Sequence, residues 1–107
     1  MTRFLADCQA RVAFDLMANT WNPVVVFALR DGARRPADLR RMIGGIRPKV
    51  LTESLRRLEG YGLVAREVGT DRVEYSLTPL GESLLGPIDA MGRWGLDHGD
   101  EVAAFDD

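Results

Sequence analysis

The chain has 107 residues, 46% of them hydrophobic, which suits a single globular domain spanning residues 1–107 around one core. No apolar run approaches the roughly 20 residues that a transmembrane helix needs, and charged residues follow the N-terminus too closely for a signal peptide, so we expect a soluble, cytoplasmic protein. One cysteine and one histidine exclude an intrachain disulfide and a zinc site of the usual ligand types, and we expect no cofactor or metal.

The formal net charge of −2 conceals an uneven distribution of charge along the chain. Residues 30–57 contain nine basic side chains and three acidic ones, a local excess of +6. Residues 97–107 contain five acidic side chains and no lysine or arginine. Solubility does not require so many arginines on one short segment, and their concentration favours a polyanionic partner.

Apolar residues at helical spacing predict two helices in the first third of the chain. The first covers about residues 8–18, with Asp7 as its N-cap. Its apolar residues are Val12, Ala13, Leu16 and Met17. Thr20 caps the second helix, which tolerates Pro23 in its first turn and ends at Gly32. Its apolar residues are Val24, Val25, Phe27, Ala28 and Leu29.

Two further helices flank a glycine turn, GGIRP. The short segment PADLRRMI begins at Pro36, a residue well suited to a helix start. Its inward-facing residues are expected to be Leu39, Met42 and Ile43. The longer segment PKVLTESLRRLEGYG begins at Pro48, and Gly60 and Gly62 end it. Its apolar stripe, with the spacing i, i+4, i+7, consists of Leu51, Leu55 and Leu58.

After Gly62 the pattern changes from helical spacing to that of strands. The runs LVAREV and RVEYSL, joined by GTD, predict a β-hairpin. Thr78 and Pro79 begin a last helix, which Gly86-Pro87 should bend. The residues on its apolar face are Leu80, Leu84, Ile88 and Met91. From residue 97 to residue 107 we expect a flexible acidic tail.

This order of elements predicts an α+β fold, a mainly α winged helix-turn-helix in which the two-stranded β-hairpin is the wing. Because the leucine stripe must face the core, the opposite face of the helix after Pro48 meets solvent, and the N-terminal half of such a recognition helix normally meets base edges. The residues that we expect to contact DNA from this face are Arg47, Lys49, Thr52, Glu53 and Arg56. We expect the phosphate backbone to be held by Arg34, Arg35 and Arg40. Arg72, at the hairpin tip, is expected to reach a minor groove or a phosphate.

Other interpretations of the same residues stay open. Arg56 and Arg57, taken alone, indicate only a solvated helix face. Glu53 either accepts a hydrogen bond from cytosine or forms an ion pair with one of these two arginines. A winged helix that docks an acidic protein partner is the alternative to DNA binding. An enzyme is not expected, because the sequence offers no paired carboxylates in an apolar setting, no nucleophile–base pair and no phosphate loop.

The segments RRPADLRRMIGGIRPKVLTESLRRLEGYGLVAREV, RVEYSLTPLG and RWGLDH, with the spacing of Cys8 and Trp21, resemble the HxlR-type winged-helix transcriptional regulators, relatives of the MarR group. The resemblance runs from Cys8 to about His98, and RVEYSLTPLG is its most specific part. It implies a homodimer, joined through dimerisation helices at both ends of the chain, that binds a pseudo-palindromic operator. The helix from Pro48 to Tyr61 would be the recognition helix, and we expect repression. The sequence departs from the family at Arg47 (often serine), at Thr20 (commonly lysine) and in a shorter wing, VGTD.

Cys8 is the candidate for redox sensing. A place in the first turn of a helix, near Arg3 and Arg11, would favour its thiolate, whereas Asp7 opposes this. The resemblance implies such a role, since several family members respond to oxidants or electrophiles at this position. The alternative is a small buried residue at a dimer interface.

A pocket between the N-terminal and last helices is the candidate site for a small-molecule effector. Its candidate lining residues are Phe14, Trp21 and Trp94. For these aromatic side chains, a place in the core or at a subunit interface is the alternative.

Overall fold

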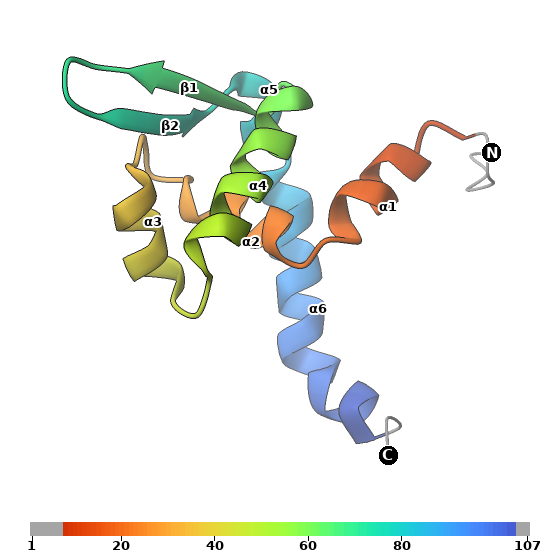
Figure 1. Cartoon of the computed structure of the whole chain (residues 1–107). Coiled ribbons are helices and arrows are strands. Elements are labelled where there is room, and N and C mark those ends of the chain that lie inside the picture. The colour runs from red at the N-terminus through yellow and green to blue at the C-terminus, as the bar shows by residue number, and fades with distance from the viewer. Residues whose placement is uncertain (1–7, 105–107) are drawn as a thin grey trace.

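In the computed structural model, which describes residues 8–104, three helices pack against one another and form the body of the molecule. They are α2 (Trp21–Ala28), α3 (Pro36–Ile43) and α4 (Pro48–Gly60). Figure 1 shows α3 and the hairpin at one side of the molecule, α1 (Arg11–Met17) at the other, and α6 (Leu85–Ala104) extending away from the body. A single turn of helix, α5 (Pro79–Glu82), joins the hairpin to α6. None of these described helices has the length and apolar character needed to cross a membrane.

The core is built from leucine and valine side chains of α2, α3 and α4. Its fully buried large apolar residues are Val25, Val26, Leu29, Leu39, Leu51, Leu55 and Leu58. The predicted leucine stripe of α4 therefore faces the core, which confirms the prediction. Met42, which the sequence places inward, is 46% exposed. That prediction was wrong because α3 has only two turns, and Leu39 together with Ile43, one turn later, takes its inward face.

The ends of the first two helices differ from the predicted caps. Thr20 stands at the N-cap of α2 but makes no capping hydrogen bond. The side chain of Asn19 replaces it, because its Oδ1 accepts a hydrogen bond from the N–H of Trp21 at 3.0 Å. Helix α1 begins at Arg11 rather than at residue 8, and its expected cap, Asp7, lies outside the described residues.

The predicted hairpin is confirmed, and it is anchored by a residue far from it in sequence. Strands β1 (Val64–Val68) and β2 (Val73–Leu77) pair antiparallel from Val64–Leu77 to Val68–Val73. Arg34, just before α3, pairs with Tyr75 of β2 through two hydrogen bonds, Arg34 N–H to Tyr75 O at 2.9 Å and Tyr75 N–H to Arg34 O at 2.8 Å. This bridge fastens the wing to the start of α3.

Helix α5 packs directly on the backbone that leads into β1. Thr78 Oγ1 accepts a hydrogen bond from the N–H of Gly81 at 3.1 Å and donates one to the carbonyl of Gly62 at 2.7 Å. A Cβ atom on Gly81 would lie 2.0 Å from the carbonyl oxygen of Leu63. The contact therefore requires a residue without a side chain at position 81.

The last helical region is interrupted, as the sequence predicts, but its end was predicted wrongly. The break at residues 83–84 lies one turn before Pro87, which has no N–H to donate to the carbonyl of Ser83. Helix α6 then continues to Ala104, where a flexible tail from residue 97 was expected. The rings of Trp94 and His98 contact each other across one turn, tilted by 39° with centroids 5.2 Å apart. Extending a formed helix also costs less free energy than starting one. Residues 105–107 lie outside the described part.

Candidate nucleic-acid interface

The turn between α3 and α4 places Arg47 at the start of the exposed basic face. Gly44 and Gly45 have φ values of 73° and 72°, a left-handed conformation that side chains disfavour. The chain then becomes extended at Arg47, the N-cap residue of α4, and Pro48 opens the helix at a position where a missing N–H costs nothing. The exposed Arg47 side chain therefore stands at the N-terminal end of α4.

The face of α4 opposite the leucine stripe is exposed, as predicted. It carries Lys49, Thr52, Glu53 and Arg56. The hydroxyl of Thr52 donates a hydrogen bond to the carbonyl of Pro48 at 3.0 Å, which leaves the oxygen of this exposed side chain able to accept one. Glu53 has no ion pair with any residue between 8 and 104, so, of the two alternatives left open for it, the ion pair with Arg56 or Arg57 does not form. Its carboxylate remains available as an acceptor.

Six exposed cationic side chains of α3, α4 and the wing have no ion pair or side-chain hydrogen bond to any residue between 8 and 104. They are Arg40, Arg47, Lys49, Arg56, Arg66 and Arg72. Binding an anion with these groups breaks no existing interaction, so the gain is not offset by a lost ion pair. Unpaired guanidinium and ammonium groups suit phosphate groups and the acceptor edges of guanine.

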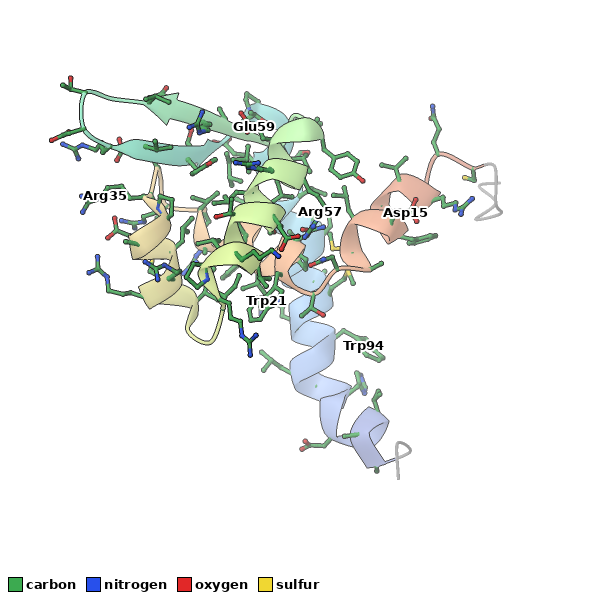
Figure 2. All side chains as sticks on the ribbon, in the orientation of Figure 1. Asp15, Trp21, Arg35, Arg57, Glu59 and Trp94 are labelled. Carbon is green, nitrogen blue, oxygen red and sulfur yellow. The ribbon has the colours of Figure 1, made fainter. Side chains whose placement is uncertain are left out.

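Arg34 and Arg57 are partly buried rather than free. The Nε atom of each is buried and has no hydrogen-bond partner among residues 8–104. The Arg57 Nη2 lies 3.5 Å from Oδ1 of Asn22. Arg57 therefore does not belong to a merely solvated face, as one interpretation of the sequence had it, and Arg34 has a second role through its bridge to Tyr75. Figure 2 shows Arg57 directed toward α2 and α1 rather than toward the α3 side.

Asn22 is the acceptor at the centre of a buried polar cluster. Its Oδ1 accepts a hydrogen bond from Oγ of Ser54 at 3.0 Å, and its Nδ2 donates one to the carbonyl of Leu16 at 3.0 Å. Ser54 lies on α4 and Leu16 on α1, so one side chain links these two helices through α2. The sequence does not signal this cluster, because its members are up to 38 residues apart, Leu16 to Ser54.

Asp38, in the first turn of α3, holds two arginines. Its Oδ2 lies 3.3 Å from Nε of Arg35, and its Oδ1 accepts a hydrogen bond from Nη2 of Arg41. The hydrogen bond from Arg41 is the largest cause that lowers the pKa of the Asp38 carboxyl below its ordinary value. Burial opposes it, and the hydrogen bond of Arg35 and the charges of both arginines add to the lowering. Arg35 was expected in the interface, but Arg41 and Asp38 were not. The spacing i, i+3 on both sides of Asp38 is the signal that could have found them.

The hairpin tip carries the last expected contact residue. Residues 69–72 connect the strands, and the N–H of Gly69 donates to the carbonyl of Arg72 at 2.7 Å, which closes the turn. The Arg72 side chain is exposed. Since Arg34 pairs with Tyr75, strand β2 is tied to the start of α3.

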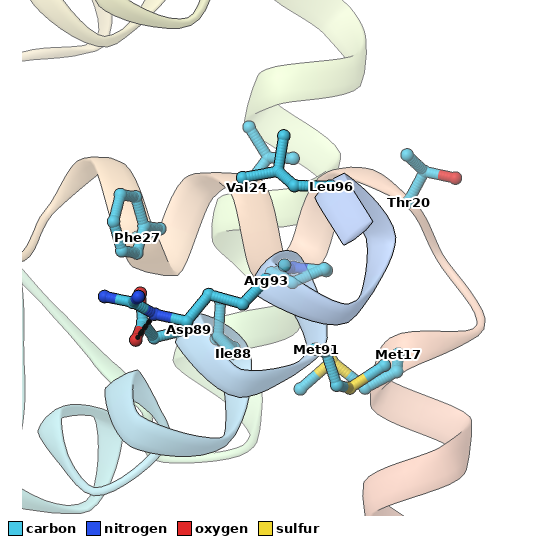
Figure 3. A pocket seen from close by; sticks show the side chains of 11 residues that line it. Met17, Thr20, Val24, Phe27, Ile88, Asp89, Met91, Arg93 and Leu96 are labelled. Carbon is cyan, nitrogen blue, oxygen red and sulfur yellow. Dashed lines mark hydrogen bonds and ion pairs between the residues drawn. The ribbon is translucent and has the colours of Figure 1, made fainter. Parts of the chain in front are cut away.

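A cleft of about 880 Å³ lies between α2 and α6, at the end of α1. Figure 3 shows its apolar lining from Val24, Ile88 and Leu96, with an ion pair between Nε of Arg93 and Oδ2 of Asp89 at 2.8 Å. The place agrees with the predicted effector pocket, but none of the predicted residues lines the cleft. Trp21 packs against the core, and the side chains of Phe14 and Trp94 are exposed and do not line the cleft. The aromatic lining was predicted wrongly because helical spacing does not show which face of α6 turns toward α2.

Cys8 is half-buried and lies in a turn before α1, not in its first helical turn. Its carbonyl accepts a hydrogen bond from the N–H of Arg11 at 3.0 Å. Arg3, the other expected neighbour, lies outside the described residues.

Comparison with known proteins places these features in context. Residues 16–103 match the model of the HxlR-like helix-turn-helix family. YtfH of Escherichia coli K12, an uncharacterized HTH-type transcriptional regulator, is 39% identical over 94 residues, which cover 85% of this chain and 75% of YtfH. A protein of Porphyromonas gingivalis W83 assigned to the MarR family of transcriptional regulators superimposes with a TM-score of 0.81 at 33% identity, covering 90% of this chain and 97% of that chain. The redox regulator HypR in its reduced form superimposes with a TM-score of 0.79 at 32% identity, covering 89% and 97%.

Proposed function

Because the chain belongs to the HxlR-like helix-turn-helix family of transcriptional regulators, we propose that it represses transcription by binding, as a homodimer, to a pseudo-palindromic operator. The observation that carries this proposal is the group of six cations without an ion pair among residues 8–104, on α3, on α4 opposite its buried leucine stripe, and in the wing. A duplex bound there would be held by many phosphate contacts at once. Occupation of an operator that overlaps a promoter would exclude polymerase. We place the protein in the cytoplasm, with the DNA that it regulates.

The residues divide by the part of the duplex that each would meet. Arg47 and Lys49, at the N-terminal end of α4, are suited to guanine edges in the major groove, and Glu53 to the amino group of cytosine. Thr52 contributes a methyl group and an acceptor, and Arg56 lies one turn further along the same face. The residues proposed to contact backbone phosphates are Arg34, Arg35 and Arg40. Arg72, in the wing, would contact the flanking minor groove or its phosphates.

The proposed dimer would form through α1 and α6. These helices expose large apolar side chains, which on a folded chain mark a surface that another protein covers. They are Val12, Phe14, Met91, Trp94, Leu96 and Val102. Leu96, at 88% exposure, is the most exposed of them. A dimer with a two-fold axis near α6 would present two copies of α4, and these must lie about 34 Å apart to meet successive major grooves.

We further propose that DNA binding responds to a signal, either oxidation or alkylation of Cys8 or an apolar effector in the cleft beside α6. Cys8 is accessible and lies directly before α1, one of the two proposed dimer helices. HypR, which the chain resembles over most of its length, is a redox regulator. Since each chain has one cysteine, a disulfide would have to join two subunits, and otherwise the product is a sulfenic acid or an adduct.

The test is selection of bound duplexes from a random pool at low and moderate salt, with and without a reductant, followed by sequencing. Recovery of an inverted repeat whose half-sites are one helical turn apart supports a sequence-specific dimer. Loss of that repeat on oxidation, and its retention in Cys8→Ser, supports the sensing proposal. Recovery of nothing above background at either salt refutes operator binding and favours the rival interpretation, a winged helix that docks an acidic protein.

A matched pair of variants separates base reading from general charge. Lys49→Ala and Arg30→Ala each remove one positive charge, but Arg30 lies outside the proposed interface, with its Cζ 4.1 Å from the centroid of the Phe27 ring. Lys49→Ala should change which base is preferred at one operator position, whereas Arg30→Ala should leave the preference unchanged. Equal effects of the two variants on the selected sequence would contradict the assignment of Lys49.

A further inference from the structure

Asp38 binds two arginines through separate carboxylate oxygens, one on each side of it along α3. The contact to Arg35 joins Nε and Oδ2 at 3.3 Å, and the contact to Arg41 joins Nη2 and Oδ1. The Asp38 side chain is only 27% exposed, whereas the side chains of Arg35 and Arg41 are 50% and 75% exposed. The carboxylate is thus the sheltered member of the group, and the two guanidinium groups are its outer members.

The two arginines keep most of their hydrogen-bonding capacity while they are held. A guanidinium has five N–H donors, and each of these arginines gives one to Asp38. The group as a whole keeps a charge of +1, because one carboxylate faces two cations. Long side chains lose conformational freedom when they are fixed, and here part of that cost is met before any ligand binds.

We propose that Asp38 is a positioning residue that holds Arg35 and Arg41 as a preformed clamp for a phosphate of the DNA backbone. The proposal rests on the proposed function, since it concerns the same duplex, and it adds Asp38 and Arg41 to the interface. Helix α3 is the first helix of the helix-turn-helix, the one that crosses the sugar–phosphate backbone when the second helix enters the major groove. Figure 2 places Arg35 at the hairpin end of α3, on the side where the wing tip also lies.

Arg40, on the same helix, shows how an arginine without such a carboxylate partner differs from the two clamp arginines. It is exposed and has no ion pair with any residue from 8 to 104. Arg40 must therefore be ordered by the DNA itself, whereas Arg35 and Arg41 are already in place. The lowered pKa of Asp38 agrees with this arrangement, because hydrogen bonds from the two guanidinium groups favour the ionised carboxylate.

The clamp is tested by whether removal of the negative charge of Asp38 strengthens or weakens DNA binding. Removing a negative charge beside DNA should strengthen binding if charge alone matters, because phosphates repel carboxylates. If Asp38 positions the arginines, Asp38→Asn should instead weaken binding by about three- to tenfold. The slope of log affinity against log salt concentration should also decrease, by the amount that one or two phosphate contacts contribute. The probe is a duplex of about 30 base pairs, long enough for two half-sites one helical turn apart. The matched control is Asp31→Asn, which makes the same charge change at an exposed residue whose nearest cation, Arg30, is 3.9 Å away.

A second set of variants keeps the test valid if Asp38→Asn does not fold, which circular dichroism will show. Replacing Arg35 and Arg41 together by lysine preserves every charge but removes the planar fork, and it should weaken binding to a similar extent. In a chain that carries Arg35→Ala and Arg41→Ala, Asp38→Asn should no longer weaken binding, because the groups through which it acts are absent.

The outcomes are distinct. Weaker binding in Asp38→Asn, with unchanged or tighter binding in Asp31→Asn, supports the clamp. Binding as tight as or tighter than that of the unaltered chain in Asp38→Asn overturns it while leaving the proposed function intact. Failure of the unaltered chain to bind any duplex overturns both. If the double lysine variant binds normally, the fork geometry is irrelevant and the clamp is also overturned.

Discussion

Ser54→Ala provides the sharpest test of how the recognition helix is held. Ser54 is fully buried on α4, and its hydroxyl donates to Oδ1 of Asn22 at 3.0 Å. Without that hydroxyl, the buried Oδ1 retains only the contact with Nη2 of Arg57, at the outer limit of 3.5 Å. Losing the hydrogen bond and leaving a buried acceptor poorly satisfied costs about 1–3 kcal/mol of unfolding free energy. The higher helix propensity of alanine recovers only about 0.5 kcal/mol of this.

The assay is thermal and urea unfolding at one fixed protein concentration, because association of two chains would make the midpoint depend on concentration. For a domain of this size, the expected net loss lowers the melting temperature by about 2–11 °C. Ser83→Ala is the matched control, since Ser83 is exposed and lies outside the core. Its effect should stay within about 0.5 kcal/mol.

A double-mutant cycle with Asn22→Ala identifies the cause. If the two side chains interact as described, the double variant should lose at least about 0.5 kcal/mol less than the sum of the single losses. Additive losses, or a loss in Ser54→Ala no larger than in Ser83→Ala, would refute the idea that this hydrogen bond fixes α4 against α2. Asn22→Ala should cost more than Ser54→Ala, because it also deprives the Leu16 carbonyl of its donor.

Further predictions concern the wing, the interface, the thiol and the effect of pH. Gly81→Ala should cost about 3 kcal/mol or more in unfolding experiments, because the new Cβ would lie 2.0 Å from the Leu63 carbonyl oxygen, and a stable variant would contradict the close packing of α5. Lys49→Ala should weaken operator binding by about 1–3 kcal/mol in a titration, and unchanged affinity would remove it from the base-reading set. Cys8→Ser should abolish any change in DNA affinity caused by peroxide or quinone while leaving the affinity of the reduced protein near normal; a full response in this variant would end the thiol hypothesis. The lowered pKa of Asp38 means that its ion pairs stabilise the fold above about pH 4 and are lost as the pH falls further, so the acid decline in stability should be shallower in Asp38→Asn, and identical acid profiles would contradict this.

Periodic patterns predicted most of the architecture. The stripe of Leu51, Leu55 and Leu58 repeats within one helix, and the strands around GTD lie next to each other in sequence, so each can be recognised locally. The exposed face of α4 follows directly from the stripe, since a helix with one buried face must expose the other. The outward positions of Arg47 and Lys49 could therefore be predicted from sequence.

The features that the sequence did not predict depend on residues far apart along the chain or on small differences in helix rotation. The bridge between Arg34 and Tyr75 and the hydrogen bond between Asn22 and Ser54 join separate elements, so no local spacing indicates them. The lining of the cleft beside α6 depends on which side of that helix turns toward α2. Met42 was predicted to face inward because it fits the apolar pattern that Leu39 and Ile43 form. In the structure these two residues occupy the inward face of α3, and the core has no place for a third.

The basic excess in residues 30–57 overstates the number of cations that are free to meet DNA. Five of its nine basic side chains already have partners or buried atoms, and these are Arg30, Arg34, Arg35, Arg41 and Arg57. Four have no ion pair or side-chain hydrogen bond to any residue in the described range 8–104, and these are Arg40, Arg47, Lys49 and Arg56. Several arginines of the first group have structural roles, since they contact the wing, the core or Asp38. The concentration of basic residues thus has two causes: some present positive charge to DNA, and others hold the elements that carry those charges in place.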